Sequence, residues 1–203
     1  MRAYAAPMAH PPESESRDRH APAASTTSAF GVLDECHRQT LAALDKLEAI
    51  ADRIEAGADP STRMLAAEVI RHFSMTARQH HEDEERHLFP KLLANADAET
   101  EQTILRLQQD HHWLDEDWHE LEPHLDAIAR GQNWYDVAFL RDGVTVFSAL
   151  SRDHIELEET FLYPEARART GPAEAEAMGR EMAARRRAAR RAAANGTAPA
   201  PRG

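Results

Sequence analysis

Hydrophobic side chains recur along most of this chain at alternating intervals of three and four residues, which is the spacing of one face of an α-helix. Residues that commonly cap helices stand in front of these stretches, at Ser28, Asp59 and Asp97. The pattern predicts three long helices, over residues 28–56, 60–93 and 97–131. A fourth is predicted to follow a cap at Asn133, with Asp136 three residues further on.

The segments at the two ends of the chain have a different composition. Residues 1–27 are rich in proline, alanine, serine and charge, and we predict that they and the last ten residues are disordered. A helix rich in alanine and arginine is predicted over about residues 173–193. The chain therefore divides into an N-terminal tail (1–27), a helical domain (28–168) and a basic C-terminal segment (169–203).

The fold class follows from the number and length of these helices. Four long amphipathic helices with short connections are typical of an up-down-up-down bundle, in which the apolar stripes face one core. No alternating pattern typical of strands is present. We therefore predict an all-α fold, a four-helix bundle with an extra C-terminal helix. Pro90 lacks a backbone N–H and should kink or end the second helix.

Composition and charge exclude several classes of protein. No run approaches the roughly 18 consecutive apolar residues that a membrane span requires, and the first residues contain no apolar stretch typical of a secretory signal. The single cysteine, Cys36, leaves no internal disulfide, and we expect it to be a small residue beside the core. These features predict a cytoplasmic protein that does not enter the membrane.

The net charge of −11 argues against nucleic acid as the main partner, because phosphate binding relies on clustered lysine and arginine. The basic exception lies near the C-terminus, at Arg185–Arg187 and Arg190–Arg191. We interpret these arginines as the solvated end of a helix, where positive charge is favoured by the helix dipole.

Four histidines interrupt the apolar stripes, one on each of the four long helices: His37, His80, His111 and His154. The first pair and the second pair are each 43 residues apart. Residues 80–90 (HHEDEERHLFP) also align without a gap with residues 154–164 (HIELEETFLYP). The chain thus looks like two copies of one helical hairpin, each with a histidine on its first helix and a His-x-x-x-Glu motif on its second.

These residue types at this spacing predict a metal centre. Residues four apart lie on one face of a helix, so Glu84 can act with His80, and Glu158 with His154. Imidazole suits iron, zinc and copper, whereas carboxylate suits harder ions, so the mixture fits iron or manganese. Two divalent ions would offset the cost of burying two carboxylates. Six residues leave two octahedral ions undercoordinated unless the glutamates bridge and an oxo, hydroxo or water ligand joins them, and open positions would take a diatomic ligand.

Three neighbouring residues remain alternative ligands. His81 and His112 could replace His80 and His111, although His80 preserves the alignment with His154 and His111 continues the stripe of its helix. Asp115, one turn after His111, is either a further ligand or a hydrogen-bond acceptor for one.

This pattern resembles the hemerythrin-like family, whose bacterial members are often called HHE cation-binding proteins. The resemblance covers about residues 30–168, and the paired His-x-x-x-Glu-Glu…Leu-aromatic-Pro motifs are its strongest part. It implies a non-haem di-iron centre in which both glutamates bridge and the ligands are His37, His80, Glu84, His111, His154 and Glu158.

Two departures from the family's oxygen carriers affect the expected function. The carriers have a second histidine one turn along the third helix, where this chain has Asp115, and an aspartate where it has Glu158. These differences argue against simple oxygen carriage and bring the chain closer to bacterial relatives linked to nitric oxide, iron or redox stress. We expect a protein that binds O₂ or NO, or senses iron or redox state. The alternatives are a di-iron enzyme that turns over NO or peroxide, an iron donor for Fe–S cluster repair, and a metal-stabilised bundle that binds a partner through its basic helix.

Overall fold

The computed structural model describes residues 28–194, and within this range the chain is helical and contains no strand. The predicted all-α class is thereby confirmed, whereas the predictions for residues 1–27 and for the C-terminal end lie outside the described residues. The chain forms α1 (Ala29–Arg53), the 3₁₀ turn η1 (Ile54–Ala56), α2 (Pro60–Arg71), the π-helical turn η2 (His72–Ala77), α3 (Arg78–His87), α4 (Phe89–Leu93), α5 (Ala98–Ala129), α6 (Val137–Leu157), the π-helical turn η3 (Glu158–Leu162), α7 (Tyr163–Ala168) and α8 (Pro172–Ala194).

The helices begin at side chains that accept a hydrogen bond from their first free backbone N–H groups. Ser28 accepts from Gly31 N, Asp59 from Thr62 N, and Asp97 from Thr100 N, as the sequence predicted. The prediction of Asn133 as the fourth cap was wrong. Asp136 is the cap of α6, because its backbone N–H donates to His124 Nδ1 and its carboxylate accepts from Phe139 N.

The second predicted helix, expected to be continuous over 60–93, is divided into pieces. It widens into η2 and is interrupted at Leu88, one residue before α4. Pro90 occupies the first turn of α4, where a missing N–H leaves no hydrogen bond unmade, and Pro164 has the same position in α7. Each proline therefore marks the start of a short helix that follows a longer helical segment.

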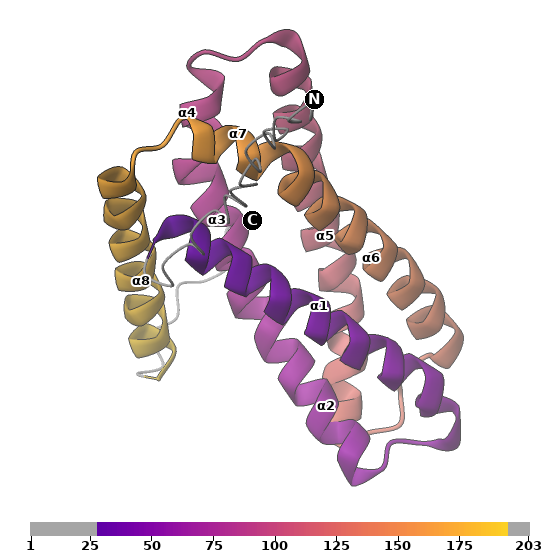
Figure 1. Cartoon of the computed structure of the whole chain (residues 1–203). Coiled ribbons are helices and arrows are strands. Elements are labelled where there is room, and N and C mark those ends of the chain that lie inside the picture. Colours follow the sequence, from indigo (N-terminus) through magenta and orange to yellow (C-terminus); the bar gives the residue numbers. More distant parts are fainter. Residues whose placement is uncertain (1–27, 195–203) are drawn as a thin grey trace, which may run out of the picture.

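The four long helical segments form a ring in which each packs against two others. α1 lies against α2 and α6, and α5 also lies against α2 and α6 (Figure 1). Their apolar faces enclose one core at the end of the ring far from α8. Large buried members of this core are Leu44, Leu47, Ile50, Val69, Phe73, Trp118, Leu121, Leu125 and Phe147.

A second core lies toward α8, which packs on α1 and α3 (Figure 1). Its members include Phe30, Leu33, Leu88, Leu107 and Tyr163, together with Met182 of α8. On each long segment the histidine lies between residues of the first core and residues of the second, as His111 lies between Leu107 and Leu114. A layer of polar side chains therefore lies between two apolar cores.

The arginines of α8 do more than the sequence predicted. Arg185 and Arg186 both pair with Asp83 of α3, which is 1 % exposed, and Arg186 Nη2 lies 2.8 Å from Asp83 Oδ2. Their interpretation as part of a solvated helix end was wrong, because the buried carboxylate requires a cationic partner. Arg187, Arg190 and Arg191 are exposed, as expected. Among residues 28–194, no helix has the length and apolar character needed to cross a membrane.

Because Met182 is fully buried in the second core, its replacement should weaken the whole fold. We expect Met182→Ala to lower the free energy of unfolding by about 2–4 kcal/mol, measured by urea denaturation. Arg187→Ala, on the exposed side of the same helix, should change it by less than about 0.5 kcal/mol. Equal stability of the Met182→Ala variant and the unmodified protein would show that α8 is not part of the cooperative fold.

Candidate metal centre

The polar layer consists of four imidazoles and two carboxylates, and each of the six residues is at most 5 % exposed: His37, His80, Glu84, His111, His154 and Glu158. α1 and α5 contribute one histidine each, α3 contributes His80 and Glu84, and the junction of α6 with η3 contributes His154 and Glu158. The sequence motifs thus place all six side chains in one interior region.

One half of the layer gathers around His37. Its Nε2 lies 3.0 Å from His80 Nε2 and 3.0 Å from Glu158 Oε2. Glu84 Oε1 lies 3.4 Å from His80 Nε2. Ligand atoms of these four residues lie within 4.8 Å of one another, a separation that one metal ion can span.

The other half gathers around His111 and His154. His154 Nε2 lies 3.1 Å from Glu158 Oε1, while His111 Nε2 lies 3.6 Å from Glu84 Oε2 and 3.8 Å from Glu158 Oε1. These residues also form a group with ligand atoms within 4.8 Å. Each glutamate therefore directs one oxygen to the His37 half and its second oxygen to the His111 half.

The buried atoms of this layer fit a cation. Within the described residues, six of them have no hydrogen-bond partner: His80 Nδ1, Glu84 Oε2, His111 Nε2, His154 Nδ1, His154 Nε2 and Glu158 Oε1. Buried polar atoms without a hydrogen-bond partner are costly. Carboxylate oxygens offer lone pairs to a cation, and so do imidazole nitrogens once they have lost their protons. Nitrogen and carboxylate oxygen together suit first-row transition metals such as iron. The residues present are therefore suited to hold metal ions.

A comparison with protein-family models agrees with this geometry. Residues 28–166 match the model described as the hemerythrin HHE cation binding domain. The chain belongs to the hemerythrin HHE family. A search of curated proteins found no match. The family match ends before α8, so the helix that pairs with Asp83 lies outside the matched residues.

The three alternative ligands, His81, His112 and Asp115, have different positions relative to the polar layer. His81 lies close to the layer, with its ring stacked on that of His111 at 4.0 Å, and it groups with His111 and His154. His112 points away from the layer, is 63 % exposed and pairs with Glu116. Asp115 is half-exposed and pairs with Arg78 at 3.3 Å, and it belongs to none of the candidate ligand groups.

Sequence reasoning missed the carboxylates that orient the histidines. Glu159 Oε1 lies 3.0 Å from His37 Nδ1, and Glu85 Oε1 lies 2.8 Å from His111 Nδ1. Each is the second glutamate of a Glu-Glu pair, so the repeated Glu-Glu in the two aligned motifs could have indicated a role for these residues. The two contacts also cross the duplication, because each glutamate serves the histidine of the other hairpin. Such contacts on the far nitrogen set the tautomer and orientation of a metal-binding imidazole.

The sequence patterns also gave no indication that the hydroxyl group of Tyr163 lies in the polar layer. Tyr163, 1 % exposed, donates a hydrogen bond to Glu84 Oε1 at 2.6 Å, and its Oη lies 3.1 Å from His37 Nε2. The alignment of the two motifs indicated only an aromatic residue at this position.

The charges of the layer are strongly coupled. Burial alone would lower the pKa of His154, but the charge of Glu158 and hydrogen bonds raise it to about 9. Burial also works against protonated His37 and His111, yet their contacts with Glu158 and Glu84 raise both pKa values. Without metal, imidazolium groups therefore balance the carboxylates. Binding of metal ions to these nitrogens would release protons.

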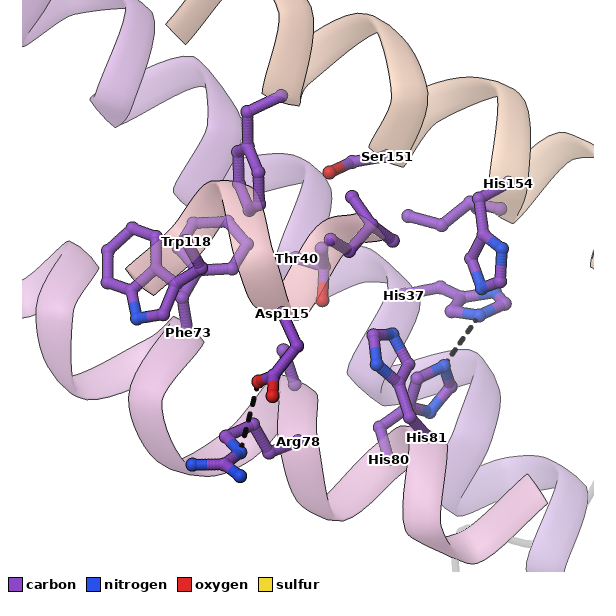
Figure 2. Close-up of a pocket in the computed structure, with 14 residues that line it drawn as sticks. His37, Thr40, Phe73, Arg78, His80, His81, Asp115, Trp118, Ser151 and His154 are labelled. Carbon is purple, nitrogen blue, oxygen red and sulfur yellow. Dashed lines mark hydrogen bonds and ion pairs between the residues drawn. The ribbon is translucent and has the colours of Figure 1, made fainter. Parts of the chain in front are cut away.

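A small cavity lies beside the layer and toward the first core (Figure 2). Its volume is about 30 Å³, and its walls are mainly apolar. Apolar lining comes from Phe73, Ala77, Leu114, Trp118, Phe147 and Ile155, and polar lining from Thr40, Ser151 and the histidines 37, 80, 81 and 154. The half-exposed Arg78–Asp115 ion pair also borders it (Figure 2).

The electrostatics of Glu84 predict that it opposes folding of the metal-free protein. Burial and the nearby charge of Glu158 raise the pKa of Glu84. A carboxyl group whose pKa is higher in the folded state destabilises the fold at pH values above its unfolded pKa. In chelator at neutral pH, Glu84→Gln should therefore unfold at a higher urea concentration than the unmodified protein, and after iron loading the order should reverse.

Glu85→Gln is the matched control, because the hydrogen bond from His111 lowers the pKa of Glu85. This neighbouring substitution should therefore not stabilise the metal-free protein. A Glu84→Gln variant that is less stable than the unmodified protein in chelator would contradict this explanation of the layer.

Proposed function

We propose that this chain is a non-haem di-iron protein of the hemerythrin type that binds O₂ or NO, or senses iron or redox state through the same centre. Its proposed ligands are His37, His80, Glu84, His111, His154 and Glu158, with His81 as an additional candidate. The proposed frame is an up-down-up-down bundle of α1, α2–α4, α5 and α6–α7.

One observation carries the proposal of two ions: both glutamates present their two oxygens to two different groups of imidazoles. A single ion would need only one of these groups. Two ions bridged by both carboxylates would use all four oxygens and would give a partner to Glu84 Oε2, Glu158 Oε1, His111 Nε2 and His154 Nε2, which otherwise have no hydrogen-bond partner. An oxo or hydroxo bridge would complete the coordination.

The neighbouring cavity supports a small ligand. Its volume of about 30 Å³ exceeds the roughly 10–15 Å³ that a cavity needs to hold one water molecule, so it has room for a diatomic molecule. Its apolar wall favours uncharged O₂ or NO over ions. Iron held beside it would supply a reversible change of oxidation state and open coordination positions for such a ligand.

The experiment that tests this function is metal analysis combined with spectroscopy under controlled gas. Purified protein loaded with ferrous iron without oxygen should retain two irons per chain, and its absorption should change on addition of NO or O₂ and recover after removal of the gas. Retention of one zinc instead of two irons, or a spectrum that does not respond to either gas, would contradict the proposal.

Two adjacent histidines offer a matched pair of variants for the ligand assignment. His111 is buried in the layer, whereas His112 is 63 % exposed and pairs with Glu116. We expect His111→Ala to lose at least one of the two irons and His112→Ala to keep both, as measured by iron content after gel filtration. Equal iron content in the two variants would exclude His111 as a ligand.

The cavity can be filled without touching the proposed ligands. Ala77 is buried in the cavity wall, so Ala77→Leu should reduce NO affinity at least tenfold while iron content is unchanged. The added side chain should lower the free energy of unfolding by about 1–3 kcal/mol. Ala149→Leu, on the exposed face of α6, should leave NO affinity unchanged. Normal NO affinity in Ala77→Leu would show that the ligand does not use this cavity.

A further inference from the structure

The two hairpins differ in one aromatic residue that faces the centre. The alignment of residues 80–90 with 154–164 pairs Phe89 with Tyr163. Their rings have equivalent places, because Tyr163 stacks on His37 at 5.1 Å with an interplanar angle of 7°, and Phe89 stacks on His111 at 5.6 Å with an angle of 15°. The duplication therefore places an aromatic ring on the first-helix histidine of each hairpin, and only one of the two rings carries a hydroxyl group.

The hydroxyl of Tyr163 lies among the proposed ligand atoms. Its Oη is 3.1 Å from His37 Nε2 and 2.6 Å from Glu84 Oε1. Around an octahedral ion with bonds of about 2.1 Å, neighbouring ligand atoms are separated by roughly 3 Å. The distances from His37 Nε2 to His80 Nε2 and to Glu158 Oε2 are both 3.0 Å, so Tyr163 Oη has the same spacing as the other proposed ligands of this half.

The opposite half has a different third donor. His81 groups with His111 and His154, and the alignment pairs it with Ile155 in the second hairpin. The His37 half thus has two imidazoles and a phenol, and the His111 half has three imidazoles. Duplication would make the two halves alike, and these two substitutions make them chemically distinct.

We propose that Tyr163 is a ligand of the ion in the His37 half. This inference rests on the proposed di-iron function and identifies a donor that the paired motifs do not contain. When the ion binds, the O–H bond of the phenol breaks, its proton leaves to solvent, and an oxygen lone pair forms the bond to the ion, with no change of oxidation state. Because a phenolate is an anionic oxygen donor, it favours the ferric over the ferrous state of that iron.

The competing role for Tyr163 is that of a positioning residue. In that case the phenol keeps its proton and its hydrogen bond to Glu84, and no bond to iron forms. The two roles differ in spectroscopy, because only a phenolate bound to ferric iron produces a charge-transfer absorption in the visible range whose resonance Raman spectrum contains tyrosine ring vibrations.

The test uses the full chain loaded with ferric iron in three forms: unmodified, Tyr163→Phe and Tyr135→Phe. Phe89 shows that a phenyl ring is accommodated at the equivalent place, and Tyr135 is a partly buried tyrosine that packs beside the first core, away from the polar layer. We expect the ring-enhanced charge-transfer band in the unmodified protein and in Tyr135→Phe, and its complete loss in Tyr163→Phe. Ferric affinity should fall roughly tenfold or more in Tyr163→Phe.

The outcomes separate this inference from the function on which it rests. Two irons per chain without the band in the unmodified protein would overturn ligation by Tyr163 and leave the di-iron centre intact. A band that persists in Tyr163→Phe would also overturn it. A protein that retains no iron would overturn both, and because the unmodified protein gives the decisive spectrum, misfolding of a variant does not weaken the test.

Discussion

Two fully buried carboxylates, Glu84 and Glu158, determine the rest of this structure. Ionised carboxylates are costly to bury without positive charge, and the imidazoles around them can supply that charge as imidazolium or bind a metal ion that supplies it. Imidazoles from four helices surround the pair, and two apolar cores close the layer on both sides. We expect the burial of Glu84 to cost folding stability in the metal-free protein and to become favourable when cations are bound, which is the usual relation between metal binding and folding.

The duplicated hairpin explains how a chain of this size assembles such a layer. Each hairpin supplies two histidines and one glutamate whose two oxygens face the two halves, and each also supplies a second glutamate that contacts a histidine of the other hairpin. Each half of the layer therefore contains side chains from both hairpins. The two hairpins differ at two aligned positions, where Tyr163 corresponds to Phe89 and His81 corresponds to Ile155. Tyr163 and His81 both lie beside the proposed ligand atoms, so these differences directly change the set of possible donors in each half.

The helical class, three of the four caps and the gathering of four striped histidines followed from local rules, because caps and apolar stripes depend on residues close in sequence. Tertiary contacts produced the differences. Asp136, not Asn133, caps α6 because His124 of the preceding helix holds its backbone N–H. Arg185 and Arg186 leave solvent because Asp83 is buried against them. The place of Tyr163 in the layer could not be predicted, because its hydroxyl contacts residues on two other helical segments.

The most direct test of the central claim, two bridged ions in one layer, is X-ray absorption spectroscopy at the iron edge of the loaded protein. The geometry of the two carboxylates predicts nitrogen and oxygen neighbours around each iron and a second iron within about 4 Å. A first shell of nitrogen and oxygen with no neighbouring iron, in protein that retains its metal, would contradict a two-ion centre.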